Sequence, residues 1–188
     1  MPKAAVFLDR DGVINRDRPD YVKCWEEFEF LPNVLEALRV LAAGTYQIVV
    51  VSNQSAIGRG LVCSREVEEI HRRMIETVRA GGGRIDAVFY CPHRPEEDCP
   101  CRKPRPGLIM RAARELNIDL AGSWLIGDDL RDLEAAKAAG VRPVLVRTGH
   151  GREIAAGNAD RMTFSFDICE DLLETVSRLL AIRPMPKS

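Results

Sequence analysis

The sequence lacks a strong net charge and any long apolar run. Its 188 residues carry 27 Lys and Arg against 28 Asp and Glu, a formal net charge of −1. This balance, without a basic stripe, gives no electrostatic reason to expect nucleic acid or a membrane surface as a partner. No apolar stretch approaches the roughly 20 residues of a membrane-spanning helix. Internal repeats and low-complexity segments are also missing. These features point away from nucleic-acid-binding, membrane and repeat proteins.

We expect no secretory signal at the N-terminus. Met1-Pro2-Lys3 leads directly into an apolar stretch without a charged and then hydrophobic leader. We therefore expect a cytoplasmic protein, in which cysteines are reduced thiols or metal ligands. The composition, 46% apolar and 29% charged, is typical of a globular protein, and the length suits one domain. We expect that domain over residues 1–182, a loose tail over residues 183–188, and a monomer.

Segments typical of buried strands alternate with segments of helical periodicity. Short apolar or β-branched runs predict strands at 4–8, 46–51, 87–90, 124–126 and 144–146. Helical spacing predicts helices at 33–43, 64–80, 106–116 and 167–180, and another that ends at Gly140. Residues 148–160 are glycine-rich and are expected to form a loop. This alternation predicts an α/β fold, a Rossmann-like parallel sheet with helices on both faces.

Carboxylates follow two of the predicted strands where each strand ends. Right-handed crossovers bring these ends to one edge of a parallel sheet, where α/β proteins place their sites. Asp9 and Asp11 are two residues apart and should project to the same side, and Asp128 or Asp129 can supply a third carboxylate. Mg²⁺ is the usual partner of such a group. We therefore expect Asp9, Asp11, Asp128 and Asp129 to hold Mg²⁺, with Asp132 in support.

Other side chains at this edge suit a phosphorylated ligand. The Ser52 hydroxyl and the Asn53 amide can donate hydrogen bonds to phosphate oxygens. The compact Lys103 ammonium can offset carboxylate and phosphate charge. Phosphoryl transfer depends mainly on positioning and charge neutralisation, and a carboxylate can serve as the nucleophile in an acyl-phosphate mechanism. The set therefore predicts phosphoryl transfer.

Four short motifs, spread over nearly the whole chain, resemble those of the haloacid dehalogenase-like phosphatases. In order, they are Asp9-x-Asp11-Gly12, Ser52 after a hydrophobic strand, Lys103, and Gly127-Asp128-Asp129-x-x-Asp132. The resemblance implies a Rossmann-like fold and a phosphoric monoester hydrolase. It implies that Asp9 is the nucleophile that becomes phosphorylated. It implies that Asp11 is the general acid for the leaving alkoxide and then the base for the attacking water.

The connections between these motifs are too short for a cap domain. The site should therefore be roofed by loops, at about residues 15–30, 54–64 and 91–105. In the third loop, Cys91-x-His93-x5-Cys99-x-Cys101 offers three thiols and an imidazole, enough for a closed tetrahedral Zn²⁺ site. We expect a structural zinc that stiffens the loop presenting Arg102 and Lys103. The alternative is a chance cluster of reduced thiols.

This zinc-type loop with Arg102-Lys103-Pro104 is similar in two branches of the family, the heptose bisphosphate phosphatases and the histidinol-phosphate phosphatases. The stretches 7–15, 52–60 and 145–149 favour the heptose branch, which implies hydrolysis of the C7 phosphate of a heptose 1,7-bisphosphate. The five-residue gap between His93 and Cys99 also occurs in the histidinol branch, and the 17–21 loop is a residue longer than the heptose pattern. Histidinol phosphate or another small sugar phosphate therefore stays an alternative substrate. A zinc-stabilised binding module without turnover is a third interpretation.

A bisphosphate needs a second anion site, a sugar's length from Asp9. Arg59, between two glycines, and Arg102 are the candidates, because arginine binds phosphate oxygens bidentately. The alternative for Arg59 is a solvated loop charge. His71 is expected to be a surface or boundary residue. The full expected set of substrate-binding residues is Asn15, Asp17, Tyr21, Ser52, Asn53, Gln54, Ser55, Arg59, Arg102 and Lys103.

Overall fold

The computed structural model describes residues 1–157 and 162–182. Its strands are β1 (Lys3–Leu8), β2 (Gln47–Asn53), β3 (Ala87–Cys91), β4 (Ile118–Gly127), β5 (Arg142–Val146) and β6 (Asp167–Cys169). Its α-helices are α1 (Val34–Ala42), α2 (Ser55–Gly58), α3 (Ser64–Ala80), α4 (Gly107–Leu116), α5 (Leu130–Ala139), α6 (Gly151–Gly157) and α7 (Leu172–Ile182). Two single-turn 3-10 helices lie at Trp25–Glu27 and Pro95–Glu97. The tail predicted at 183–188 lies outside the described residues.

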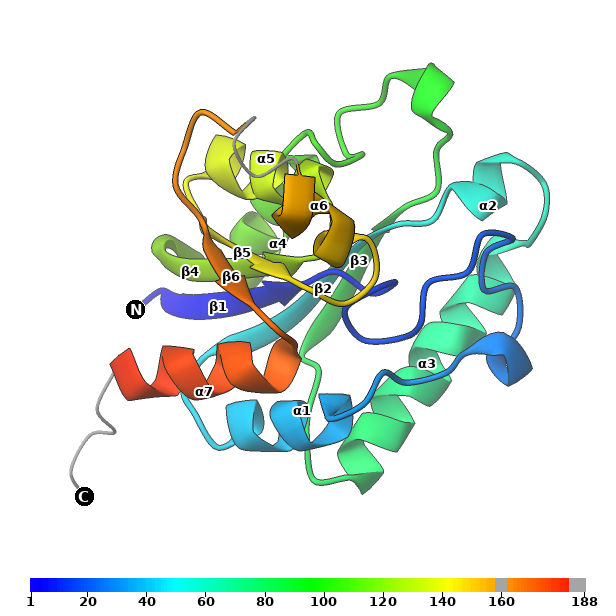
Figure 1. Ribbon diagram of the computed structural model, residues 1–188. Coiled ribbons are helices and arrows are strands. Elements are labelled where there is room, and N and C mark those ends of the chain that lie inside the picture. Colours follow the sequence, from blue (N-terminus) through cyan, green and yellow to red (C-terminus); the bar gives the residue numbers. More distant parts are fainter. Residues whose placement is uncertain (158–161, 183–188) are drawn as a thin grey trace.

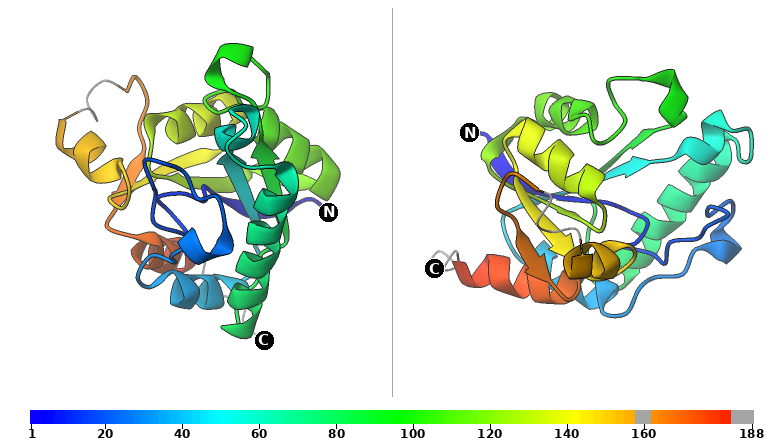
Figure 2. Two further views of the ribbon diagram at one scale, coloured as in Figure 1. Left: turned by 90° about the vertical axis from the view of Figure 1, so that its right-hand side faces the viewer. Right: turned by 45° about the horizontal axis from the view of Figure 1, so that its top comes forward.

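The strands form one six-stranded sheet in the order β3-β2-β1-β4-β5-β6, and all neighbouring pairs are parallel. Helices cover both faces of this sheet (Figures 1 and 2). The α/β, Rossmann-like fold predicted from the sequence is confirmed. β2 and β3 lie on one side of β1, and β4, β5 and β6 lie on the other, so the direction in which the chain adds strands reverses between β1 and β4. Open α/β sheets bind ligands in the crevice at such a switch point, outside the carboxyl ends of the strands.

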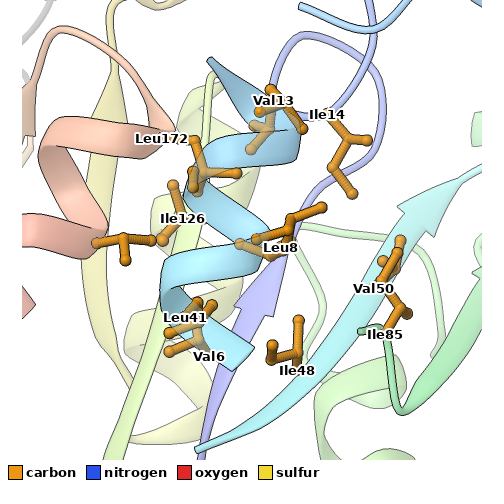
Figure 3. Packing of buried hydrophobic residues seen from close by; sticks show 14 of the residues in the cluster. Val6, Leu8, Val13, Ile14, Leu41, Ile48, Val50, Ile85, Ile126 and Leu172 are labelled. Carbon is orange, nitrogen blue, oxygen red and sulfur yellow. The ribbon is translucent and has the colours of Figure 1, made fainter. Parts of the chain in front are cut away.

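Alternate residues of β1 supply the two halves of the core. Val6 and Leu8 point to the face covered by α1, α3 and α7, where they pack with apolar residues such as Leu41 and Leu172 (Figure 3). Ala5 and Phe7 point to the opposite face and pack with residues of α4 and α5. β1 is buried on both faces, as a central parallel strand should be. This double burial fixes the position of the two aspartates that follow it.

Several elements differ from the sequence prediction. β4 begins at Ile118 instead of Trp124, and α2 lies within the predicted loop at 54–64. β6 replaces the predicted start of the last helix, which begins at Leu172 instead of Asp167. At three residues β6 is too short to show a strand period, and it is identified only by its pairing with β5. The predicted loop at 148–160 contains α6, which is anchored by Ile154 packed with Leu133 and Leu145. Residues 158–160 of that prediction lie outside the described residues.

No inserted cap domain is present within residues 1–157 and 162–182. The chain after β1 forms an extended loop with a 3-10 turn, and the chain after β2 forms the single-turn α2 (Figure 2). None of the helices in the described ranges is long and apolar enough to cross a membrane. The carboxyl ends of the strands are therefore covered only by loops, as predicted.

Candidate active site

A cavity of about 420 Å³ lies over the carboxyl ends of the central strands. This volume is in the range of pockets that hold small-molecule ligands. Its walls come from every region that the sequence predicted to meet at this edge. The lining residues are Asp9, Arg10, Asp11, Asp17, Arg18, Pro19, Tyr21, Val22, Ser52, Asn53, Gln54, Ser55, Arg59, Pro95, Arg102, Lys103, Asp128, Asp129, Arg131, Asp132 and His150.

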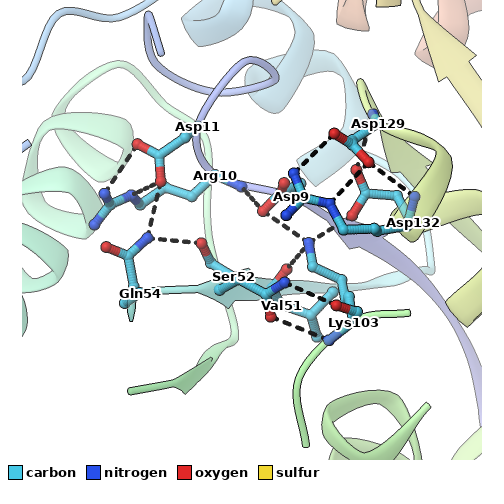
Figure 4. Close-up of polar contacts among 11 residues, drawn as sticks. Asp9, Arg10, Asp11, Val51, Ser52, Gln54, Lys103, Asp129 and Asp132 are labelled. Atoms are coloured by element: carbon cyan, nitrogen blue, oxygen red, sulfur yellow. Dashed lines mark hydrogen bonds and ion pairs between the residues drawn. The ribbon is translucent and has the colours of Figure 1, made fainter. Parts of the chain in front are cut away.

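Lys103 is one of two buried cations that line this cavity, with 2% of its surface exposed; Arg10 is the other. Its backbone N–H donates to the Asn53 side-chain oxygen, and its carbonyl accepts from the Asn53 Nδ2, each at 3.1 Å. This reciprocal pair fixes the lysine at the end of β2. The ammonium then lies 2.9 Å from Asp9 Oδ1 and 2.6 Å from Asp132 Oδ1, and donates to the Val51 carbonyl at 2.8 Å (Figure 4). Asn53, expected to bind phosphate, is therefore used to position Lys103.

The carboxylates around Lys103 carry more negative charge than one ammonium can offset. Burial raises the pKa of Asp9 to about 7, against the opposing effect of Lys103. Burial, with repulsion from Asp9 and Asp132, raises the pKa of Asp128 to about 9. Burial alone would lower the pKa of Lys103, but the charges of Asp132 and Asp9 outweigh it and raise that pKa. Binding of a further positive charge would therefore stabilise the ionised carboxylates of this group.

Asp9, Asp128 and Asp132 each offer a carboxylate oxygen, and these oxygens lie within 4.8 Å of one another. Backbone packs closely around Asp128, because a Cβ at Gly12 or at Gly149 would lie 2.0 Å from its Oδ2. Only glycine fits at these two positions. A compact all-oxygen group with unbalanced charge suits a hard divalent cation such as Mg²⁺. The donor set therefore fits the predicted metal.

The structure directs Asp129 away from this group. Its carboxylate caps α5 by accepting from the Arg131 backbone N–H at 2.9 Å, and it also pairs with the Arg131 guanidinium at 2.8 Å. Asp132, which the sequence suggested only as support, occupies the third place among the carboxylates. The reason is local, since the N-cap residue of a helix turns its side chain back onto the first turn.

Asp11 lies beside Asp9 in sequence but is held by a different set of partners. Its two oxygens accept from Arg10 Nε and Nη2 at 3.2 and 2.9 Å and from Gln54 at 2.8 Å (Figure 4). They also accept from Asn15 at 2.9 Å. Burial would raise the pKa of Asp11, but the charge and hydrogen bonds of Arg10, with those of Asn15 and Gln54, outweigh it and lower that pKa. The carboxylate is thus held as an anion, outside the Asp9–Asp128–Asp132 group.

The residues expected to bind substrate divide into two sets. Asn15 is completely buried, and Gln54 donates to both Asp11 and Ser52 Oγ. Asn15, which does not line the cavity, therefore supports Asp11 instead of facing a ligand, contrary to expectation. The other nine do line the cavity: Asp17, Tyr21, Ser52, Asn53, Gln54, Ser55, Arg59, Arg102 and Lys103.

The sequence prediction missed several cavity residues. Arg18, Arg131 and His150 line the cavity, and His150 Nε2 lies 3.0 Å from Asp17 Oδ2. The backbone N–H of His150 also donates to Asp128 Oδ2 at 2.9 Å. Their sequence signal is weak, because isolated charges in a loop or a first helical turn are usually solvated. Only the fold brings the residues after β5 to the rim of this cavity.

The cysteine-histidine loop folds into a compact cluster. The Cys101 sulfur lies 3.3 Å from His93 Nδ1 and 3.3 Å from the sulfurs of Cys91 and Cys99. Burial would raise the pKa of Cys99, but hydrogen bonds from Cys101 and Cys91 outweigh it and lower that pKa to about 7. Three thiols and one imidazole that converge in this way fit tetrahedral Zn²⁺.

The cluster is joined directly to the cavity. The Arg102 guanidinium donates to the carbonyl of His93 at 3.3 Å, and Lys103 follows in the chain. Arg59, at the end of α2, lines the same cavity with an exposed side chain, and the Gly58 N–H before it donates to the Pro92 carbonyl of this loop at 2.9 Å. The loop that carries the four possible zinc ligands therefore also determines where two cavity cations lie.

Comparison with known proteins places this arrangement in a family. The HAD-hydrolase-like model matches residues 100–175, and the polynucleotide kinase 3 phosphatase model matches residues 5–137. The D-glycero-beta-D-manno-heptose-1,7-bisphosphate 7-phosphatase of Pseudomonas aeruginosa is 39% identical over 180 residues, covering 96% of this chain and 99% of that protein. The protein of the same name from Bordetella bronchiseptica is 42% identical over 176 residues, covering 93% and 97%.

Solved structures agree. The crystal structure of D,D-heptose 1,7-bisphosphate phosphatase from B. bronchiseptica, complexed with magnesium and phosphate, has a TM-score of 0.90 and 40% identity, and covers 96% of this chain and 99% of that chain. The corresponding enzyme from Burkholderia thailandensis has a TM-score of 0.73 and 37% identity. Fold and matched models define a haloacid dehalogenase-like phosphatase. Within that class, the chain belongs to the D-glycero-beta-D-manno-heptose-1,7-bisphosphate 7-phosphatase family.

Proposed function

We propose that the chain is a Mg²⁺-dependent phosphatase that removes the C7 phosphate of D-glycero-D-manno-heptose 1,7-bisphosphate through a phosphoaspartate. The observation that carries the proposal is the pair of separately held aspartates at the end of β1. Asp9 lies against Lys103, and Asp11 lies within a shell of donors. Relatives of this name over nearly the whole length of the chain support the substrate.

The two aspartates divide the reaction between them. A carboxylate oxygen of Asp9 attacks the phosphorus, the bond to the C7 oxygen breaks, and an aspartyl phosphate forms. Asp11 gives its proton to the departing oxygen and then takes a proton from the attacking water. The oxygen of that water bonds to phosphorus as the bond from phosphorus to the Asp9 oxygen breaks, which releases inorganic phosphate and restores the Asp9 carboxylate. Asp11 must be protonated for the first step, and a phosphate dianion bound beside Asp9 favours that form, since like charges raise a pKa. Lys103 and Ser52 hold the phosphate oxygens.

Asp9 and Asp128 are the residues that would hold Mg²⁺, with Asp132 as the third carboxylate within reach. The ion, when bound, supplies positive charge that balances the phosphate and the carboxylates around it. Lys103 keeps its proton next to these carboxylates and orients Asp9 with or without the ion. Asp11 and Asp129, the other two expected ligands, are engaged by Arg10 and Arg131 in this structure.

The four-ligand cluster is proposed to bind one structural Zn²⁺. Purified protein, prepared without chelators, should contain about one zinc per chain by metal analysis. Cys99→Ser should lower the thermal midpoint and kcat/KM together, because the same loop positions Arg102 and Lys103. Cys24→Ser, at an exposed cysteine outside the cluster, should change neither. A wild-type protein with zinc far below one equivalent would contradict the site.

Arg59 and Arg102 are proposed to bind the phosphate that is not transferred. Arg59→Ala and Arg102→Ala should each raise KM for the 1,7-bisphosphate roughly ten- to a hundredfold, the worth of a charge-assisted hydrogen bond. They should raise KM for heptose 7-phosphate much less. Arg114→Ala, at an exposed arginine on α4, is the control. Equal losses on both substrates would instead assign the arginines to the transferred phosphate.

A side-by-side turnover assay tests the substrate assignment. Initial rates are measured on heptose 1,7-bisphosphate and on histidinol phosphate with Mg²⁺ present. The proposal predicts a kcat/KM at least about a hundredfold higher for the bisphosphate, because a monophosphate leaves the arginines without an anion. A preference for histidinol phosphate would overturn the heptose assignment, although the chemistry at Asp9 would stand.

A further inference from the structure

A buried contact between α3 and the loop after β1 has no role in the mechanism above. Arg10 is 1% exposed and His71 of α3 is 5% exposed, and Arg10 Nη1 lies 3.2 Å from His71 Nε2. The sequence prediction placed His71 at the surface or its boundary, and the structure contradicts this. A buried guanidinium needs partners for its donors, because leaving them unpaired costs free energy. His71 supplies such a partner from a different element of the fold.

The direction of this hydrogen bond fixes the form of the histidine. Arginine only donates hydrogen bonds, so Nε2 must be the acceptor and the ring proton must be on Nδ1. Burial, with repulsion from Arg10, lowers the pKa of His71 to about 3, so the ring is neutral at physiological pH. The Tyr90 ring packs against it, with a centroid distance of 5.4 Å. A neutral, packed acceptor in one tautomer is a rigid anchor for Arg10.

The other edge of the same guanidinium binds Asp11. Arg10 Nε and Nη2 donate to the two oxygens of Asp11 at 3.2 and 2.9 Å. A planar guanidinium held on one edge by His71 and on the other by a carboxylate has little freedom to rotate. The chain His71–Arg10–Asp11 therefore transmits the position of α3 to the residue proposed as acid and base.

We propose that His71 is a positioning residue for the phosphatase reaction, which aims Asp11 at the leaving oxygen by holding Arg10. This inference rests on the proposed role of Asp11. Proton transfer requires that donor and acceptor lie within hydrogen-bond range and in alignment. A small displacement of the Asp11 carboxyl from the leaving oxygen therefore lowers the rate substantially. Loss of His71 should therefore affect substrates that need a proton on the leaving group more than substrates that do not.

Three variants separate positioning from packing. His71→Phe keeps a ring against Tyr90 and removes the acceptor. His71→Gln keeps an oxygen that can accept from Arg10. Met74→Ala, at a fully buried apolar residue of the same helix, weakens packing without changing this hydrogen bond. Asp11→Asn serves as the reference for loss of the acid itself.

The readout is kcat/KM on heptose 1,7-bisphosphate, whose alkoxide needs a proton, and on p-nitrophenyl phosphate, whose phenolate does not. This parameter covers the steps up to release of the leaving group and excludes the later attack by water. His71→Phe should lower it roughly ten- to a hundredfold on the sugar, as for loss of a charge-assisted hydrogen bond, and less than about threefold on the aryl phosphate. His71→Gln should keep the wild-type ratio of kcat/KM on the sugar bisphosphate to kcat/KM on the aryl phosphate. Met74→Ala should lower the thermal midpoint without changing this ratio.

Several outcomes would overturn the proposal. Equal losses for His71→Phe on both substrates would mean a packing role, and no loss on either would mean no role. If Asp11→Asn itself showed equal losses, the acid assignment and this inference would both fail. Failure of the wild-type protein to hydrolyse the bisphosphate, with normal turnover of the aryl phosphate, would contradict the proposed substrate. The positioning role would then be tested on another alkyl phosphate, where an unchanged His71→Phe ratio would overturn it.

Discussion

Asp9→Asn is expected to lower turnover by about 10⁴-fold or more, the scale seen when a covalent nucleophile is removed. An amide is a poor nucleophile toward phosphorus and a weaker ligand for Mg²⁺ than a carboxylate. The fold should survive, because the amide oxygen can still accept from Lys103. Burial disfavours the charged form of Asp9 and raises its pKa to about 7, so replacing this carboxyl by a neutral amide removes that unfavourable burial. The thermal midpoint should stay within about 4 °C, which corresponds to roughly 1 kcal/mol in a domain of this size.

The measurement pairs steady-state turnover with acid-quench trapping of labelled phosphoprotein. Wild-type protein should yield trapped phosphate on Asp9, and the variant should yield none. Asp167→Asn, at an exposed position on β6, is the matched control and should behave like the wild type. Residual activity of the Asp9 variant near that of the wild type, or labelling at another residue, would contradict its role as nucleophile.

Asp11→Asn is expected to lower kcat/KM on the bisphosphate about 10²- to 10⁴-fold, the usual contribution of general acid–base catalysis. The loss should be smaller with p-nitrophenyl phosphate, because that leaving group needs little protonation. The Asn side chain also cannot take a proton from the attacking water. The variant should therefore release a burst of nitrophenolate and accumulate phosphoenzyme, which rapid-quench kinetics would show. Normal hydrolysis of the sugar by this variant would exclude the acid–base role.

The edge of the sheet at which the site lies was predictable from sequence because strand periodicity and strand ends are local features. The apolar run before Asp9 and the β-branched run before Ser52 identify two central strands, and parallel connections bring their ends together. β6 was missed because a three-residue strand has no measurable period. α6 was missed because its flanking glycines suggested a loop, although Ile154 anchors it to Leu133 and Leu145.

Side-chain direction at the site was harder to predict than residue type. Asp9 and Asp11 were expected to face one cation together. In the structure Arg10 binds Asp11, which lies outside the Asp9–Asp128–Asp132 group. Arg10 follows a strand end, where an arginine would ordinarily be solvated, but in the structure it is buried and contacts His71 of α3. Asp129 was expected as a metal ligand and Asp132 in support, but Asp129 caps α5 and Asp132 lies with Asp9 and Asp128.

The same limit applies to His71. From the sequence, His71 was expected to be a surface or boundary residue of the helix at 64–80. The tertiary contact with Arg10 decides its burial and its tautomer. A supporting residue such as His71 thus carries almost no sequence signal, whereas Asp9, Ser52 and Lys103 fall in recognisable motifs.

Phosphorus NMR of the product from heptose 1,7-bisphosphate tests the central claim most directly. The two phosphates have distinct signals, one from the primary ester at C7 and one from the anomeric phosphate at C1. Hydrolysis at C7 predicts loss of the C7 signal, growth of inorganic phosphate in equal amount, and an intact anomeric signal. Loss of the anomeric signal first, or no change under conditions where p-nitrophenyl phosphate is hydrolysed, would contradict the account.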